Sequence, residues 1–242
     1  MRCLWLIVLA TVMIMPTLTM AAPRVVGQKI LGVYTGDDQG AYDQVYAAIQ
    51  KATGADLPKI EVMSAGEAID LYTKGQAECM TPGNTNRDFY PVTFQAIQSK
   101  PFNVAKVYIF TAPGTEPLSS LDALKGKRIA VRDGFAYGAT FDAAGLNPEK
   151  NTTIEANIAK LLKGRLDAIV DFVPDAWDAF LNYGMPPLPY RADKPVAVHQ
   201  DAVVCRETPE TRALITTIDQ GIKILSSGSA LKELLGTSYS PE

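Results

Sequence analysis

The sequence predicts an α/β fold of two lobes, with two mainly parallel sheets, helices on both faces and a cleft between the lobes. Two segments, 121–134 and 161–172, lead to this prediction. Each runs through a glycine and a basic residue into an apolar, β-branched run that ends at an acidic or glycine-containing turn. Such runs suit parallel strands buried on both faces, and ligands of open α/β sheets bind just beyond the carboxyl ends of those strands. The turns at 132–134 and 171–172 are therefore the first candidate positions for a ligand.

Strand and helix patterns alternate in the N-terminal part of the chain. Residues 29–34 predict a first strand, and the apolar spacing i, i+3, i+4, i+7 from Val45 predicts an amphipathic helix. Residues 59–63 predict a second strand. Ser64 then has capping-box spacing with the glutamate three residues later, and opens a helix that ends near Gly75. This β-α-β-α order is typical of a parallel sheet with helices on its faces.

A second α/β unit follows a long connection. Residues 81–101 have little periodicity and lead into 104–111, which we predict to be a strand that crosses from one lobe to the other. Residues 129–131 and 168–170 predict two buried strands. The apolar spacing within 154–162 predicts a helix between them.

A proline-rich stretch, 185–189, marks the return from the second unit, and an apolar run at 196–204 follows it. Two C-terminal helices are predicted, one with an apolar face from Leu214 to Leu225 and one near residues 231–235.

Two crossing segments near 111–114 and 191–194 divide the chain in this interpretation. The predicted divisions are a signal peptide at 1–21, lobe 1 at 22–112 and 193–242, and lobe 2 at 113–192.

The N-terminus has the layout of a secretory signal peptide. Arg2 supplies a positive start, the apolar stretch 3–15 is too short to span a bilayer, and small residues follow at 19–22. We expect cleavage after Ala21, with Ala22 as the next choice, and therefore a periplasmic protein. A retained N-terminal anchor is the alternative.

The charge balance argues against nucleic acid as a partner. Without residues 1–21, which contain Arg2 and no acidic residue, 22 Lys+Arg remain against 26 Asp+Glu, so the net charge is 22 − 26 = −4. Nucleic acids and anionic membrane surfaces require clustered Lys and Arg, and no basic stripe is present.

Cys79 and Cys205 are the two cysteines that remain after the signal peptide. An exported protein meets an oxidising compartment, so we predict a disulfide between them. Because it closes a long loop, it could add on the order of 4 kcal/mol of stability. Two buried thiols that pack as small apolar side chains are the alternative.

The order of these motifs resembles that of the amino-acid-type (family 3) extracellular solute-binding proteins of bacterial ABC transporters. Residues 121–131 (LDALKGKRIAV) are similar to the family's L-x-D-L-K-G-K-x-V-G-V, and residues 162–171 (LKGRLDAIVD) to L-x-x-G-R-V-D-A-V-V-x-D. Residues 99–102 (SKPF) resemble F-S-x-P-Y, and residues 225–231 (LSSGSAL) resemble L-x-x-D-G-T-L. The resemblance covers about 27–235 and implies the type II periplasmic binding protein fold.

The resemblance also implies a binding site for an amino acid. In that family an arginine of the first lobe grips the ligand carboxylate, and an aspartate at the end of a later strand takes the α-amino group. By position these are Arg87 and Asp171. A guanidinium fork matches two carboxylate oxygens, and a shielded carboxylate accepts strongly from an ammonium. The alternatives are a solvated loop arginine for Arg87 and a helix N-cap for Asp171.

The second-lobe turn departs from the family pattern. The family has Gly-Ser-Thr there, with backbone N–H groups that assist ligand binding. This chain has Gly134, Phe135, Ala136 and Tyr137, so the N–H groups remain and the hydroxyl is missing.

The first lobe departs as well, because its loop is short and lacks the family's P-P-F aromatic segment. Tyr34 or Tyr42 would have to supply a stacking face, with core packing as the alternative. Asp37 and Thr81 complete the candidate ligand-binding set. These departures argue against assuming an α-amino acid as the ligand.

The fold implied by the resemblance also bears on the cysteines. In type II lobes the strand that returns after the second crossing lies beside the third strand of the first lobe. In our interpretation Cys79 follows that third strand and Cys205 ends the returning one, which favours the disulfide.

We therefore expect a binding protein without cofactor or metal. It would close, as a monomer, over a small polar solute such as an amino acid or a related compound, and pass it to a membrane permease for ABC-type uptake. A periplasmic sensing subunit for a receptor or kinase is the alternative within the same class.

A dehydratase-like enzyme on the same fold is the alternative of another class. Asp37, Asp171 and Asp175 could serve as acid or base. The sequence has no G-x-S-x-G elbow, no glycine-rich phosphate loop and no Cys/His metal spacing. The one histidine, His199, lies in the apolar returning strand, and we interpret it as a packed or edge residue.

Overall fold

The structure is a computed structural model that describes residues 22–236 and residue 239. The predicted signal peptide lies outside the described residues. The strands are β1 (Val25–Gln28), β2 (Ile60–Met63), β3 (Cys79–Gly83), β4 (Ala96–Gln98), β5 (Asn103–Thr111), β6 (Ile129–Arg132), β7 (Glu149–Asn151), β8 (Ala168–Val173) and β9 (Ala197–Arg206). The helices are α1 (Ala41–Thr53), α2 (Ala65–Thr73), the 3₁₀ helix η1 (Asp122–Leu124), α3 (Ala139–Asp142), α4 (Ile154–Leu162), α5 (Asp175–Asn182), α6 (Pro209–Ser226) and α7 (Ala230–Leu235).

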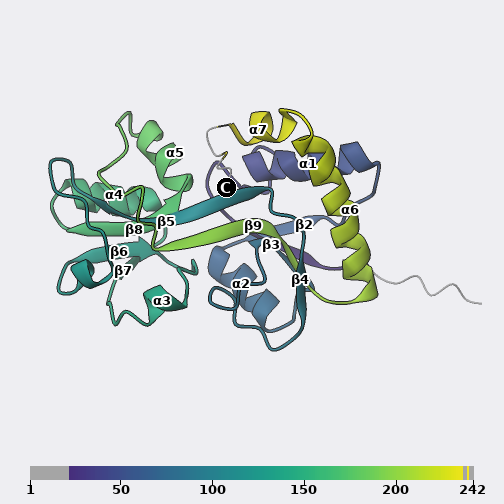
Figure 1. Ribbon diagram of the computed structural model, residues 1–242, viewed down its shortest axis with the longest axis horizontal. Helices are drawn as coiled ribbons and strands as arrows, with labels where there is room; N and C mark the ends of the chain where they lie inside the picture. Colours follow the sequence, from purple (N-terminus) through teal and green to yellow (C-terminus); the bar gives the residue numbers. More distant parts are fainter. Residues whose placement is uncertain (1–21, 237–238, 240–242) are drawn as a thin grey trace, which may run out of the picture.

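These elements form two lobes joined by the long strands β5 and β9, which cross from one lobe to the other (Figure 1). The first lobe contains β1 to β4 with α1, α2, α6 and α7, and the second contains β6 to β8 with η1, α3, α4 and α5. The residue bounds of the two lobes given in the sequence analysis remain a prediction. Among the described residues, no helix is both long and apolar enough to cross a membrane.

The two predicted sheets are hydrogen-bonded into one path through the crossing strands. The strand order is β2-β1-β3-β9-β5-β8-β6-β7, with β4 also paired to β9. Pairing is parallel inside each lobe, between β1 and its neighbours β2 and β3 and between β6 and its neighbours β7 and β8. It is antiparallel wherever β5 or β9 takes part. The crossing strands therefore provide the bridge between the sheets.

The predicted first strand is wrong in position. The strand is Val25–Gln28, which pairs on both sides and is buried throughout. Residues 29–34 instead fold back on themselves, with the Ile30 N–H donating to the Tyr34 carbonyl at 2.9 Å. Gly32 in their middle has φ +73°, a conformation that glycine adopts without strain and that ends an extended run. Both windows are apolar in sequence, and Ile30, Val33 and Tyr34 are buried although they form no strand.

The predicted helices and caps are confirmed. Helix α1 ends at Gly54, which has φ 66° as a left-handed C-cap. Helix α2 starts at Ser64, whose Oγ accepts from the Glu67 N–H at 3.4 Å. Helix α4 spans Ile154–Leu162, as its apolar spacing predicts. Strand β8 runs to Val173, two residues past Asp171, so Asp171 lies inside the strand rather than at its end.

Helices cover both faces of each lobe. In the first lobe α1, α6 and α7 pack on one face through residues such as Ile49 and Ile218, and α2 packs on the other through Tyr72. In the second lobe α4 and α5 cover one face, and η1 and α3 cover the other. Parallel strands buried on both faces explain the continuous apolar runs seen in the sequence.

Cys79 and Cys205 form a disulfide, as predicted. The two residues are directly opposite each other in the antiparallel pair of β3 and β9, and both are fully buried. Cys79 begins β3 instead of following the third strand, which corrects the sequence interpretation. The bridge closes a sequence separation of 126 residues and ties the returning strand to the first lobe.

Candidate functional site

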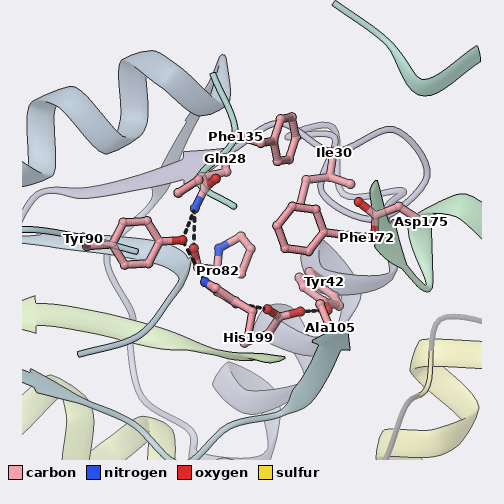
Figure 2. A pocket seen from close by; sticks show the side chains of 12 residues that line it. Gln28, Ile30, Tyr42, Pro82, Tyr90, Ala105, Phe135, Phe172, Asp175 and His199 are labelled. Atoms are coloured by element: carbon pink, nitrogen blue, oxygen red, sulfur yellow. Dashed lines mark hydrogen bonds and ion pairs between the residues drawn. The ribbon is translucent and has the colours of Figure 1, made fainter. Parts of the chain in front are cut away.

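A cavity lies where the two lobes and both crossing strands meet (Figure 2). Its volume is about 30 Å³, enough for one or two water-sized groups. The lining residues are Gln28, Ile30, Tyr42, Pro82, Tyr90, Ala105, Phe135, Ala136, Phe172, Asp175, His199 and Asp201. They come from the first lobe, from the second lobe and from β5 and β9, so that relative motion of the lobes would change the cavity.

One side of the cavity is a chain of buried polar groups. Gln28 Nε2 donates to the Pro82 carbonyl at 2.6 Å and to Tyr90 Oη at 3.2 Å. Tyr90 Oη lies 2.8 Å from His199 Nε2, and His199 Nδ1 lies 2.7 Å from Asp201 Oδ1. Since Gln28 donates to Tyr90, the Tyr90 hydroxyl can donate to Nε2, which leaves the imidazole proton on Nδ1 facing Asp201. The two hydrogen bonds hold the imidazole of His199 between Tyr90 and Asp201.

The chain ends at Tyr42 and Asn103. The Tyr42 hydroxyl donates to Asp201 Oδ2, and Asn103 Nδ2 donates to the Tyr42 oxygen at 2.9 Å. Burial raises the pKa of Tyr42 well above its ordinary value, and the nearby Asp201 raises it further. Tyr42 therefore keeps its proton and stays a donor. The carboxylate of Asp201 is thus buried and held in position by contacts with Tyr42 and His199.

The opposite side of the cavity contains a buried cluster of one arginine and two aspartates. Arg132 Nε donates to Asp171 Oδ1 at 2.8 Å, and Arg132 Nη2 donates to Asp175 Oδ2 at 2.7 Å. The side chains of Arg132, Asp171 and Asp175 are 5%, 0% and 11% exposed. The Phe135 ring covers the guanidinium, with the Arg132 Cζ 3.9 Å from the ring centroid. The hydrogen bonds between Arg132 and the two aspartates are therefore charge-assisted, and the Phe135 ring adds a cation–π contact in an environment of low polarity.

The pKa values in this cluster follow from burial and pairing. Burial alone lowers the pKa of Arg132, but Asp171 and Asp175 more than compensate, and its pKa is raised. Burial raises the pKa of Asp171 to about 6, with Asp175 adding to the rise and Arg132 opposing it. Burial also raises the pKa of Asp175. Arg132 opposes this rise, and the carboxylates of Asp201 and Asp178 add to it. Arg132 therefore offsets only part of the effect of burial on the two carboxylates.

The raised pKa of Asp171 predicts a defined pH dependence of stability. Between about pH 4 and 6 the folded protein binds this proton more tightly than the unfolded chain, so the contribution of Asp171 falls as pH rises through that window. Asp171→Asn removes this titration. Between pH 4 and pH 7 the wild type should lose roughly 3 kcal/mol of unfolding free energy that the variant does not lose. The reason is that the pKa of Asp171 is about 6 in the folded protein and about 4 in the unfolded chain. Urea unfolding of both proteins at the two pH values measures this difference, and parallel pH profiles would contradict it.

Several predicted site residues come together at the cavity. Phe135, Ala136 and Tyr42 line it. Asp171 lies outside the lining, and its carboxylate accepts from Arg132 and from the Phe172 N–H. It makes no N-cap hydrogen bond to α5, so the alternative of a helix cap is wrong. Tyr137 is buried, and its hydroxyl oxygen accepts from the Arg132 N–H at 2.8 Å.

Other predicted residues lie away from the cavity. Tyr34 is buried in the first-lobe core beside Thr81, whose side chain hydrogen-bonds it. Asp37 is an exposed loop residue that accepts from Thr35 and Gln39. Arg87 is exposed in the segment after β3 and is outside the cavity lining. The roles assigned to these residues by resemblance remain predictions.

The sequence interpretation missed most of the polar groups of the site. Arg132 was seen only as part of a turn, and Gln28, Tyr90 and Asp201 were not singled out. His199 is buried in β9, as expected, but also contacts Asp201. The one available signal was the His-x-Asp spacing of His199 and Asp201, which places both on the same face of a strand.

The second-lobe turn also makes a close contact with the first lobe. Gly134 follows β6, and Gly66 is in the first turn of α2. A Cβ added to Gly66 would lie 3.3 Å from the Gly134 Cα. Phe135 and Ala136, next in the turn, pack against first-lobe clusters. The lobes are therefore in a closed arrangement.

No protein-family model matches the chain, and no curated protein sequence matches it. Solved structures do match. The ligand-binding core of GluR0 from Nostoc punctiforme in complex with L-glutamate has a TM-score of 0.72 and 15% identity, over 90% of this chain and 100% of that one. The arginine-, lysine-, histidine-binding protein ArtJ from Geobacillus stearothermophilus has a TM-score of 0.66 and 19% identity, over 91% and 96%.

A third similar structure is a histidine kinase sensor domain with similarity to periplasmic binding proteins, with a TM-score of 0.68 and 14% identity, over 91% of this chain and 98% of that one. Identities this low establish the fold alone. The chain has the type II periplasmic binding protein fold, as the sequence motifs predict.

Proposed function

We propose that this protein is an exported solute-binding protein that closes over a small polar solute between its lobes. The observation that carries the proposal is the cavity at the junction of the lobes, which is lined by residues of both lobes and of both crossing strands. Such sites at the meeting point of domains are the usual places for small ligands. Because a solute there would contact both lobes at once, it would favour the closed arrangement.

The similar structures support this proposal. The GluR0 core is bound to L-glutamate, and ArtJ is an arginine-, lysine-, histidine-binding protein. By analogy we propose a periplasmic protein that delivers an amino acid or a related compound to a membrane permease for ABC-type uptake. Similarity to a kinase sensor domain supports the sensing alternative to the same degree.

A ligand screen tests the proposed function. Native mass spectrometry of the purified protein, followed by thermal-shift measurements with amino acids, polyamines, organic acids and sugars, should identify a solute that binds one to one. Ala136→Leu should abolish the shift, because Ala136 lines the cavity on a half-buried loop and a larger side chain fills it. Ala143→Leu, at an exposed position, is the control and should bind normally. Absence of any bound solute, or unchanged binding by Ala136→Leu, would refute the proposal.

Lobe closure gives a separate prediction. In Gly66→Val the new side chain meets Gly134 across the lobe contact. We expect at least a tenfold loss of solute affinity, with unfolding free energy within about 1 kcal/mol of wild type because valine is tolerated in a helix. Isothermal titration calorimetry measures the first and urea unfolding the second. Gly228→Val, where the added side chain meets open space, is the matched control. Full affinity in Gly66→Val would mean that this contact plays no part in binding.

A further inference from the structure

We infer that the ligand of the cavity is a small organic cation without a carboxylate, such as an alkylamine or a methylated ammonium, bound against Asp175. The inference rests on the proposed function and narrows it. It differs from the expectation of an α-amino acid, which requires a free cationic group for the ligand carboxylate.

The charges around the cavity are unbalanced. Arg132 supplies one positive charge against the two carboxylates of Asp171 and Asp175. Asp201 adds a third carboxylate, which contacts His199 and accepts from Tyr42. The twelve lining residues include no Lys or Arg. The carboxylates at this buried site therefore outnumber its one arginine.

Buried charges without partners are costly, so the site favours a ligand that brings positive charge. An amino acid would add a carboxylate to this negative potential. Arg132 lies outside the lining of the cavity, its Nε and Nη2 donate to Asp171 and Asp175, and Phe135 covers one face of its guanidinium. Arg87 lies outside the lining. The cavity is thus unsuited to the ligand carboxylate that the family pattern implies.

Acceptors and aromatic faces for a cation are both present. Arg132 bonds Asp175 through Oδ2, and the Asp175 carboxylate is directed toward the cavity beside Phe172 and Ile30 (Figure 2). Behind it, Oδ2 of the fully buried Asp171 receives no hydrogen bond within the described part of the chain. Four aromatic side chains line the cavity: Tyr42, Tyr90, Phe135 and Phe172. Aromatic faces around a carboxylate attract alkylammonium groups.

The size of the site limits the ligand. The cavity of about 30 Å³ accepts only a small head group in the closed arrangement. A neighbouring groove of about 330 Å³ shares Ile30 and Asp175 with it and is flanked by the exposed Leu31 and Leu181. Its lining also includes Arg132, Glu155 and Asp178. An ammonium at Asp175 could therefore extend a short uncharged or apolar tail into the groove.

Calorimetric titration of the full mature protein with matched probes tests this inference. Choline, its neutral carbon analogue 3,3-dimethyl-1-butanol and its carboxylate analogue glycine betaine form one series, and ethylamine with L-alanine forms another. The cation of each series should bind at least ten times more tightly than its neutral or carboxylate-bearing counterpart. Asp175→Asn should weaken cation binding at least tenfold, whereas Asp122→Asn, an exposed carboxylate outside the cavity, should not change it.

The outcomes distinguish failure of the inferred ligand class from failure of the proposed function. The comparison of ligands uses the wild-type protein, so it does not depend on the folding of a variant. If L-alanine, glycine betaine or another carboxylate ligand binds more tightly than the matched cation, the inferred ligand class is wrong and the proposed function stands. Equal binding of choline and its neutral analogue would also overturn the class. If no solute of these series or of the wider screen binds, both proposals fail.

Discussion

Arg132→Met should lower the free energy of unfolding by about 3–5 kcal/mol at pH 7, the largest effect expected for a single substitution in this protein. The substitution leaves Asp171 and Asp175 buried, with exposures of 0% and 11%, and without their cationic partner. It also removes the guanidinium from beneath the Phe135 ring. Urea unfolding monitored by circular dichroism measures the loss. A loss below 1 kcal/mol would show that the cluster is more hydrated than its burial indicates.

Two comparisons distinguish a loss of stability caused by unpaired charge from one caused by lost packing. The triple variant Arg132→Met, Asp171→Asn, Asp175→Asn removes all three charges together and should recover most of the stability, because replacing a whole buried ion cluster is far less costly than breaking it. The single variant should also lose less at pH 4 than at pH 7, because burial raises the pKa of both carboxylates and they protonate. Equal losses at both pH values would assign the effect to packing instead.

Removal of the disulfide should cost about 4 kcal/mol. The bridge joins Cys79 and Cys205 across 126 residues, and the loss of chain entropy in the unfolded state grows with loop length. The double variant Cys79→Ala, Cys205→Ala keeps the site small and apolar and should unfold at a correspondingly lower urea concentration. Reductant should lower the stability of wild type by a similar amount and leave the double variant unchanged.

The same bridge can be counted chemically. Alkylation of the unfolded mature protein without reductant should leave its mass unchanged, and reduction before alkylation should add two groups. Two alkylated thiols in the absence of reductant would contradict the disulfide.

Local patterns predicted the parts of the fold that depend on neighbouring residues. The spacing within 154–162 placed α4, and the Ser64 cap placed the start of α2. The first strand was misplaced because two adjacent windows are both apolar, and only pairing with β2 and β3 selects Val25–Gln28. That choice depends on long-range contacts, which a local pattern does not contain.

The site was harder to predict because its residues are brought together only by the fold. Asp171 was found through its strand motif, but its partner Arg132 lies on another strand of the same sheet, 39 residues earlier. Tyr42 and Asp201 are 159 residues apart and meet through a hydrogen bond. A motif within one segment of the sequence does not indicate which distant residues contact that segment in the fold. The departures from the family pattern in the 134–137 turn were nevertheless visible in the sequence, and they agree with the inferred ligand, which has no carboxylate.

The central claim, that a solute bound between the lobes holds them closed, is tested most directly by a distance between the lobes. Leu162→Cys on α4 and Ile224→Cys on α6 place nitroxide labels at exposed positions in different lobes. Pulsed electron paramagnetic resonance should give a broad or longer distance distribution without solute, and a single narrower and shorter distribution when a binding solute is saturating. An unchanged distribution on saturation with a solute that binds would contradict the claim.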